Sequence, residues 1–571
     1  MNPRSRSPFL WRALSFALIT IALAVAPPAL AWQDGAVATK SVSTLTASES
    51  EAAARVKAET IREVTSTLAE PEMEGRGTGT PGGEKAARYI ADRFARLGLK
   101  PLGDAGTYLQ AIKFRSSQIM PESSIKTSDT SLKLGQDFIV APPYTMASAD
   151  ASGEMVFVGY GVTSTELKRD DLAGLDVKNK IVVLVNGRPK NADEAAWSKA
   201  TSNQAISHNL IARGAAGIIL AYVAPSQQPY ALIANYLMRR RVTLADGSQP
   251  SLKVPPVMVV GSEGAEKLFN GSGLTFAQAM QKAESGEFAS QALKKSATLA
   301  VRIKMEESTG SNVVALLEGS DSKLKEQALV YTAHYDAYGV DSAGRIYPGA
   351  ADNALGVGMI TSIAEAYTRT AQRPRRSLIF LAVTGEEYGL LGAEHWVNHP
   401  TWPIERVAAD LNFDGIGTEV YGPVKRIVGF GAEYSDLGRV FEEVSGATGN
   451  TVTPDPFPEE KVFYRSDHYA FVQKGVPALM LLGAPGGDVM PFLARAKKWM
   501  ETDYHQPTDT VRPDWNWEGP RTLAAVGLVI GMRVANAEAM PAWLPSAPFK
   551  RATVTSPPTL QGMRLTADAR R

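Results

Sequence analysis

The chain has 571 residues, of which 44% are hydrophobic and 21% are charged. This composition is typical of a globular protein and excludes a fibrous or wholly disordered one, and the length predicts two folded units. The formal net charge is +1, so we expect neither nucleic acid nor an anionic membrane as a partner. The chain has no cysteine, which excludes disulfides and thiolate chemistry.

The first 31 residues have the pattern of a signal peptide. Three arginines, the last of them Arg12, precede an apolar run over residues 13–26, and Ala29-Leu30-Ala31 forms a small-residue cleavage site. An N-terminal membrane anchor is the alternative, but the apolar run is short for a span. Cleavage after residue 31 would leave a net charge of −2, because three arginines and no acids are lost. We therefore expect an exported protein, periplasmic or secreted, without stable membrane insertion after cleavage.

Residues 32–50 are small and polar, which predicts a flexible leader. The first part of the main domain is expected over residues 51–116, with helices over 51–68 and 84–97. Between these helices Gly77, Gly79 and Gly82 have the spacing of a dinucleotide-binding fingerprint. That fingerprint must follow a strand, whereas a helix precedes this one, so we interpret the glycine run as a tight structural loop.

Short β-type runs with polar connections fill residues 117–303 and predict a smaller, β-rich inserted domain. Residues 304–540 return to alternating strand and helix patterns. They predict the second part of an α/β domain, with a mixed, mostly parallel central sheet flanked by helices. Five prolines between Pro541 and Pro558 predict a poorly packed C-terminal tail over residues 541–571.

Residues that can bind a metal follow three apolar runs of the second part. His334 ends ALVYTAH, Glu386 and Glu387 end SLIFLAVTGEE, and Asp414 ends VAADLNFD. If these runs are strands of one parallel sheet, their carboxyl ends meet at one crevice. Each residue alone could be a helix cap or a surface group. Five potential ligands at such positions are hard to assign to chance, however, because the chain has only six histidines. The five candidate ligands for two zinc ions, with Asp352 as the natural bridge, are His334, Asp352, Glu387, Asp414 and His505.

Glu386 and Glu387 are adjacent, so their side chains diverge and can take different roles. One can bind metal while the other accepts the proton of a metal-bound water, whose pKa the metal lowers. Asp336 lies two residues after His334 and is expected to accept its remaining ring N–H, which would fix the tautomer.

This set of residues resembles the secreted di-zinc aminopeptidases of the MH clan of metallopeptidases. The resemblance rests on His334-x-Asp336, Asp352-Asn353, Glu386-Glu387, Asp414 and His505. The loop GRGTGTPG, the run Ser466-Asp467-His468 followed by GVPAL, and HQPTDT around His505 are also similar. The inserted segment resembles a protease-associated domain in DLAGLDVKNKIVVLVNG and ARGAAGIIL. In all, the resemblance covers about residues 50 to 540.

The resemblance implies a zinc exopeptidase fold and an aminopeptidase that hydrolyses the N-terminal bond of peptides with a free N-terminus. It implies that His334 and Asp414 hold one zinc, that Glu387 and His505 hold the other, and that Asp352 bridges the two. Glu386 would be the general base for a di-zinc-bound hydroxide and would later pass the proton to the leaving amine. The resemblance also implies a cis peptide at Asp352-Asn353.

Two other functions remain open: a carboxypeptidase of the same clan, and a catalytically silent, receptor-like binding protein. Tyr464 could stabilise the oxyanion, and Asp467 and His468 could be structural or could contact substrate, so their roles stay undecided. Ser466-Asp467-His468 cannot form a catalytic triad, because successive side chains point apart. We interpret His395 and His399 as ordinary helix residues. The sequence does not predict an oligomeric state.

Overall fold

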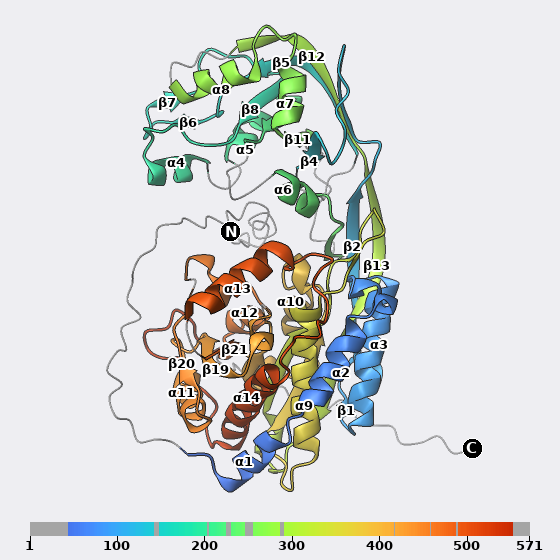
Figure 1. Ribbon diagram of the computed structural model, residues 1–571, viewed down its shortest axis with the longest axis vertical. Helices are drawn as coiled ribbons and strands as arrows, with labels where there is room; N and C mark the ends of the chain where they lie inside the picture. Colours follow the sequence, from blue (N-terminus) through green and yellow to red (C-terminus); the bar gives the residue numbers. More distant parts are fainter. Residues whose placement is uncertain are drawn as a thin grey trace, which may run out of the picture. The chain divides into compact units, whose positions relative to one another are not determined.

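The computed structural model describes residues 44–551 apart from 142–147, 202–204, 224–229, 246–254, 286–290, 416, 457 and 487–488. The expected signal peptide and residues 552–571 of the expected tail lie outside the described residues. The described chain divides into two compact units (Figure 1). The insert unit is Lys113–Ser308, and the large unit comprises the residues up to Ile112 and from Thr309 onward. The expected inserted domain, residues 117–303, lies within the insert unit.

The large unit is built on a mixed sheet with the strand order β10-β2-β13-β17-β14-β18-β21-β19-β20, in which β1 also pairs with β13. Its edge strand β10, Arg241–Leu244, comes from the inserted segment and pairs antiparallel with β2. Strands β17, β14, β18 and β21 are parallel, whereas β13 and β19 pair with this group antiparallel. The predicted fold class, a mixed and mostly parallel sheet flanked by helices, is confirmed. The strands are β1 Lys100–Pro101, β2 Leu109–Ile119, β13 Ile303–Leu317, β14 Ala328–His334, β15 Gly339–Val340, β16 Ile346–Tyr347, β17 Ser377–Val383, β18 Val407–Asn412, β19 Val424–Phe430, β20 Thr451–Val452 and β21 Ala478–Pro485.

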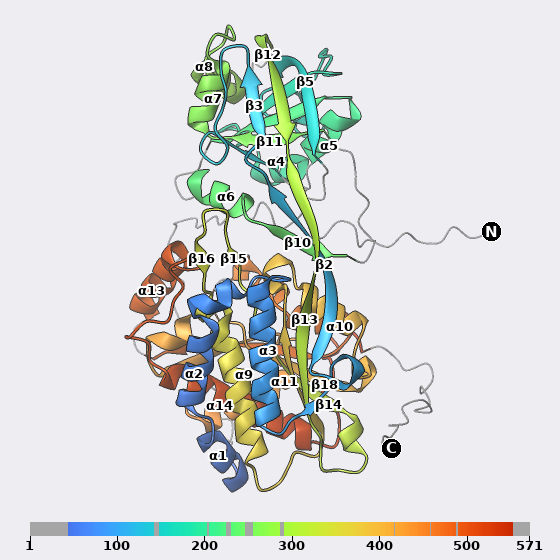
Figure 2. The ribbon, with the colours of Figure 1, turned by 90° about the vertical axis from the view of Figure 1, so that its right-hand side faces the viewer.

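Helices cover both faces of this sheet. Alternate residues of a strand point to opposite sides, and here both sides carry apolar side chains that the helices bury. Tyr331 of β14 belongs to the core that α9 and α14 share, whereas Val330 packs on the other face with α10 and α12. Helices α2, α9 and α3 lie side by side in Figure 2. The helices are α1 Ala47–Ala54, α2 Ala58–Leu68, α3 Pro81–Arg96, α9 Leu355–Thr368, α10 Leu391–Asn398, α11 Leu437–Ala447, α12 His468–Gln473, α13 Val489–Thr502 and α14 Glu518–Asn536.

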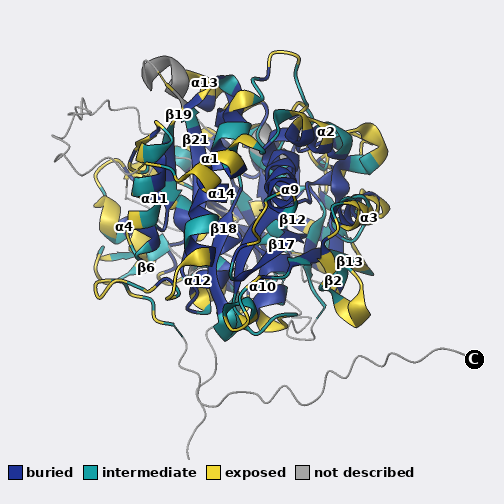
Figure 3. Cartoon of the chain, turned by 90° about the horizontal axis from the view of Figure 1, so that it is seen from below, coloured by how far each residue is buried: buried dark blue, intermediate teal, exposed yellow. Residues whose placement is uncertain are grey.

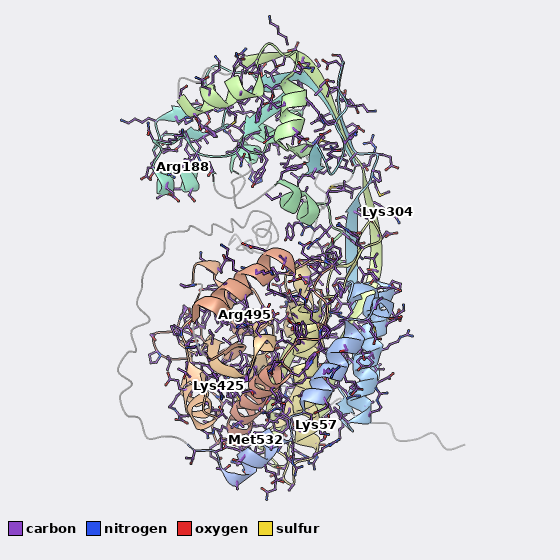
Figure 4. The ribbon with its side chains drawn as sticks, in the orientation of Figure 1. Lys57, Arg188, Lys304, Lys425, Arg495 and Met532 are labelled. Atoms are coloured by element: carbon purple, nitrogen blue, oxygen red, sulfur yellow. The ribbon has the colours of Figure 1, made fainter. Side chains whose placement is uncertain are left out.

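Helix α9 is the central helix of the large unit. Its residues 355–367 are all buried, which Figure 3 shows as a dark blue helix, so other elements enclose this helix on every side. At the N-terminus of α2, Lys57 (labelled in Figure 4) pairs with Glu365 of α9 at 2.9 Å. Because Asp352 lies three residues before the start of α9, this enclosed helix helps to fix the position of that carboxylate.

The insert unit has its own sheet, in the order β3-β12-β5-β8-β9-β11-β4, with β5, β8, β9 and β11 parallel. Ile181 and Val183 of β8 face the core beneath α7 and α8, and Val182 faces α5 on the other side. The strands of this sheet are β3 Ser124–Thr127, β4 Phe138–Val140, β5 Ala149–Phe157, β8 Ile181–Val185, β9 Gly217–Ala221, β11 Val257–Val260 and β12 Gln291–Val301, and a separate pair is formed by β6 Thr163–Ser164 and β7 Arg169–Asp170. The helices of the insert unit are α4 Glu194–Thr201, α5 Ala205–Ala212, α6 Tyr230–Leu237, α7 Ser262–Phe269 and α8 Phe276–Ser285.

Two terminal segments differ from the sequence-based expectation. Thr46 and Glu49 form a reciprocal capping box, so α1 begins at Ala47, inside the expected leader. At the other end, Arg551 donates hydrogen bonds to the carbonyl oxygens of Val407 and Ala408, each at 2.7 Å. Residues 541–551 therefore pack on the large unit, and the expectation of a poorly packed tail is wrong for this segment.

Helix α14 approaches β14 so closely that a methyl group on Gly531 would lie 1.7 Å from Tyr331 Oη. We expect Gly531→Ala to lower the free energy of unfolding by about 1–3 kcal/mol, because it overpacks the core. The matched control is Gly446→Ala in α11, where nothing lies within 4 Å of the new methyl group. This control is expected to be neutral or stabilising by up to about 1 kcal/mol. Thermal unfolding midpoints measure the difference, and equal midpoints for the two variants would contradict the packing described.

Candidate metal centre

The candidate ligands lie at the carboxyl ends of neighbouring parallel strands. His334 is the last residue of β14, Asp414 follows β18 by two residues, and Glu387 lies in the turn Glu386–Tyr388 after β17. Asp352 lies in the helical turn Ala350–Ala354 that leads into α9, and His505 follows α13. Since β17, β14 and β18 are adjacent and parallel, their carboxyl ends meet at one edge of the sheet.

These residues form two groups that share one carboxylate. His334 Nε2 lies 3.2 Å from Asp352 Oδ1 and 3.3 Å from Asp414 Oδ1. His505 Nε2 lies 3.2 Å from Asp352 Oδ2 and 3.1 Å from Glu387 Oε2. Within each group the potential ligand atoms all lie within 4.8 Å of one another. Asp352 therefore presents one oxygen to each group, and the predicted cis peptide after it, Asp352-Asn353, is confirmed.

The environment of His334 differs in one respect from the expectation. Its Nδ1 lies 3.2 Å from the backbone carbonyl of Asp336, and 3.7 Å from the Asp336 carboxylate. Because a carbonyl only accepts, Nδ1 carries the proton and Nε2 is free to face the cluster. The Asp336 carboxylate instead accepts hydrogen bonds from the Glu386 backbone N–H at 3.2 Å and from Thr78 Oγ1 at 2.9 Å.

Glu386 lies beside the two groups but belongs to neither. Its Oε2 is 3.8 Å from His334 Nε2, and 12% of its side chain is exposed. Burial raises its pKa well above the ordinary value, and the carboxylates of Asp414 and Asp467 add to this effect against the opposing charge of His334. Such a carboxyl group is suited to hold a proton near neutral pH.

The centre carries an excess of negative groups. Burial alone would lower the pKa of His505, but the neighbouring Glu387 and Asp352 carboxylates outweigh it and raise that pKa to about 9. Burial raises the pKa of Glu387, and the charge of Asp352 raises it further. Four carboxyl groups thus surround two imidazoles, which is the electrostatic environment that a cation stabilises. The four are Asp352, Glu386, Glu387 and Asp414.

Three contacts around the ligands have no clear sequence pattern. Ser466 Oγ donates to Asp414 Oδ2 at 2.5 Å and accepts from Asn412 at 2.7 Å. The ring of His505 is stacked on Tyr504, with centroids 3.6 Å apart, and Tyr338 meets it edge-on at 4.9 Å. Ser466 belongs to the run Ser466-Asp467-His468 noted in the sequence. Tyr338 has no such pattern, because the residue that it contacts, His505, lies 167 positions away.

The residues left undecided by the sequence lie in different surroundings. Tyr464 is 43% exposed and makes ring contacts with Phe463 and Tyr469. Asp467 is fully buried, and neither carboxylate oxygen has a hydrogen-bond partner among the described residues. The rings of His395 and His399 stack on each other at 4.6 Å within and just after α10, outside both ligand groups.

Comparison with known families matches residues 312–529 to the model of peptidase family M28. Over these residues the chain is similar to the peptidases of family M28. Family M28 belongs to the MH clan, so the resemblance based on the ligand residues is confirmed. A protease-associated identity for the insert unit is not shown by these comparisons.

Curated relatives align with part of the chain. A vacuolar membrane protease of Clavispora lusitaniae is 31% identical over 171 residues, which are 30% of this chain and 15% of that protein. One of Schizophyllum commune is 28% identical over 209 residues, 36% of this chain and 21% of that protein. The chain thus spans about a fifth or less of these relatives. Their names contradict the expectation of an exported, periplasmic or secreted protein, which is wrong on this finding. No helix among the described residues is long and apolar enough to cross a membrane.

Solved structures share the fold of the chain at low sequence identity. An aminopeptidase from Aneurinibacillus sp. strain AM-1 matches with a TM-score of 0.57 and 18% identity, over 88% of this chain and all of that chain. A zinc aminopeptidase from Bacillus subtilis matches with a TM-score of 0.51 and 18% identity, over 85% and 96% of the two chains. At this identity the likeness establishes the fold of the chain alone.

Burial of His468 predicts a pH-dependent stability. It lowers the pKa of His468 to about 3, whereas the unfolded chain has the ordinary value of about 6.5. The unfolded state therefore binds more protons below pH 6.5, and stability that is complete above this pH falls as the pH is lowered. At pH 5 the loss is about 2 kcal/mol.

We expect His468→Gln to remove this pH dependence. Between pH 7 and pH 5, the unfolding midpoint of the native protein should fall further than that of the variant. Both proteins are measured with a chelator present, so that metal loss does not contribute. Parallel pH profiles would show that His468 is not held neutral in the folded chain.

Proposed function

We propose that the chain is a zinc-dependent aminopeptidase that removes the N-terminal residue from peptides with a free N-terminus. The observation that carries the proposal is the pair of ligand groups that share Asp352, each with one imidazole and two carboxylates. Nitrogen and oxygen donors of this kind are those of catalytic zinc sites. The M28 match supports a peptidase, and the two solved structures named above are aminopeptidases.

The residues present fit two zinc ions per chain. One would be held by His334 and Asp414, the other by Glu387 and His505, and each would share Asp352. The excess of carboxylates over imidazoles favours cations at both positions. When bound, zinc supplies a Lewis acid for the scissile carbonyl and lowers the pKa of the attacking water towards 7.

Glu386 is proposed as the general base. It accepts the proton of the attacking water and later donates it to the leaving amine. Its backbone N–H is held by Asp336, the residue whose carbonyl also accepts from His334 Nδ1. Asp336 therefore positions the base and one ligand together, which assigns it a positioning role in the reaction.

The substrate must arrive on the side where the centre is open. The side chains of His505, Asp414 and Glu386 are 21%, 15% and 12% exposed, whereas His334 is fully buried. The base and one ligand of each group are thus partly exposed, and a peptide can reach the centre through them.

The insert unit is proposed to be a protease-associated domain. The proposal rests on its sequence resemblance and on its own sheet and core, which allow it to be a separate folded domain.

The ligand arrangement predicts the zinc content of single variants. The native protein should carry two zinc ions per chain. His505→Ala should keep one, because the group of His334, Asp352 and Asp414 remains, whereas Asp352→Ala should keep fewer than one, because it removes a ligand from both groups. His399→Ala is the control and should keep two. Metal analysis after gel filtration measures the content, and two zinc ions on His505→Ala would contradict the assignment.

The proposed reaction predicts a requirement for a free terminal amine. A short peptide with a free N-terminus should be cleaved, and its N-acetylated form should not. Chelation should abolish cleavage and added zinc should restore it. Release of the C-terminal residue from the acetylated peptide would indicate a carboxypeptidase instead, and activity that survives complete chelation would exclude zinc catalysis.

Glu386→Ala separates the base from the ligands in the same assay. General-base catalysis contributes about 10²- to 10⁴-fold, so kcat should fall by at least this factor while both zinc ions stay bound. Glu405→Ala, on the loop before β18, is the control and should keep native kcat. Near-native turnover by Glu386→Ala would remove Glu386 as the base.

A further inference from the structure

The glycine-rich loop of residues 75–80 has no role in the proposed reaction, yet it holds an unusual residue. Arg76 is fully buried, and its φ of 50° lies in the left-handed region that a residue with a side chain seldom adopts. A charged side chain is costly to bury unless all its donors are satisfied. We therefore expect specific contacts that compensate both the backbone strain and the burial of the charge of Arg76.

Arg76 directs its guanidinium group to four backbone carbonyl oxygens. Its Nε donates to Tyr335 at 2.5 Å, and Nη1 donates to Leu68 at 2.6 Å and to Pro348 at 2.5 Å. Its Nη2 donates to Gly349 at 2.7 Å. Tyr335 directly follows His334, and Pro348 and Gly349 lie just before Asp352. One side chain thus ties the end of α2 to the backbone on which two ligands are carried.

Asp509 holds the same segment from the other side. Its carboxylate accepts from the backbone N–H groups of Ala351 at 3.0 Å and Asp352 at 3.1 Å. Its backbone carbonyl accepts from Ala350 at 3.2 Å. Asp509 is 2% exposed, so water competes little for these bonds. Carbonyls before Asp352 are bound by Arg76, and N–H groups up to Asp352 are bound by Asp509.

The rest of the loop lies against the same backbone. Gly77 forms an isolated parallel bridge with Ala337, and Thr78 donates to Asp336. A methyl group on Gly349 would lie 3.0 Å from Arg76 Nη2, at a φ of 55°. The close approach explains why small residues occur where the loop meets the ligand-bearing segments.

We propose that Arg76 and Asp509 are positioning residues that clamp residues 348–352 and hold Asp352 where both metal positions can share it. The inference rests on the proposed function, because it assumes that Asp352 binds metal. The clamp acts on backbone atoms, so it fixes the carboxylate without occupying its oxygens.

Electrostatics supports the same arrangement. Burial lowers the pKa of Arg76 to about 10, so the side chain stays positive at neutral pH, and Asp509, Asp336, Asp352 and Glu387 all favour that charge. A fixed positive charge behind the ligands reduces the repulsion among the carboxylates. The clamp therefore also lowers the electrostatic free energy of holding these carboxylates close together before metal binds.

The test compares Arg76→Lys with a matched buried arginine. Arg376, also fully buried, donates to the carbonyls of Val534, Ala537 and Glu538, but lies directly before β17, at the opposite end of that strand from Glu386. Lysine keeps the charge but lacks the planar fork of donors. Each full-length variant is titrated with zinc against a chromophoric chelator, and its unfolding midpoint, kcat and KM are measured in parallel.

We expect Arg76→Lys and Asp509→Asn to weaken zinc binding by about 10- to 100-fold and to lower kcat more than they change KM. Arg376→Lys should lower the unfolding midpoint but keep native zinc affinity. Native zinc affinity in both clamp variants would overturn the proposal. So would failure of both to fold while Arg376→Lys folds, since the pair would then serve global stability. A native protein that binds zinc but cleaves no peptide would refute the proposed function alone, because the zinc affinities of the variants would still test the clamp.

Discussion

The parallel pairing of β14 with β17 on one side and β18 on the other is the constraint on which the centre depends. Parallel strands in register end at the same edge, so residues that follow them are brought together whatever their distance in sequence. Each of these strands is buried on both faces, and two helical layers hold it in place. A shift of one residue would turn Tyr331 away from its core and move His334 away from Asp352. The apolar packing of the sheet therefore sets the geometry of the polar groups at its edge.

Each ligand group needs carboxylates that lie close together in a largely buried site. Carboxylates close together repel one another, and burial increases that repulsion because water screens it less. Asp352 reduces the number needed, since its two oxygens face different histidines. The backbone contacts of Asp336, which accepts from His334 through its carbonyl and from Glu386 through its side chain, add order without adding another ligand.

The sequence was informative where a candidate ligand directly follows a buried strand. Runs such as ALVYTAH and SLIFLAVTGEE show a buried strand and the polar residue that follows it, so the sheet, His334, Asp414 and the pair Glu386-Glu387 could be predicted together. Asp352 and His505 follow no such run. The partner of His334 Nδ1 could not be predicted, because carboxylate and carbonyl of Asp336 are equally near in sequence and the backbone conformation selects between them.

Other features depend on contacts that no local pattern contains. Arg76 meets Tyr335 across 259 positions, and Asp509 meets Asp352 across 157. The glycine run was correctly interpreted as a tight loop, but its contents gave no indication of what the arginine binds. The C-terminal prolines suggested loose packing, whereas Arg551 finds the two carbonyls at the start of β18. In each case a polar side chain satisfies backbone groups that are distant along the chain, which composition alone does not reveal.

The chain enters the insert unit along β2 and leaves it along β13, and these two strands are neighbours in one sheet. The two ends of about two hundred intervening residues are therefore held together by the host itself. An inserted domain whose ends already meet imposes little loop-closure entropy on its host, whatever its length or internal fold. We therefore expect this position of the large unit to tolerate exchange: a different insert, a shorter one or a plain hairpin could join β2 to β13 without altering the register of β17, β14 and β18.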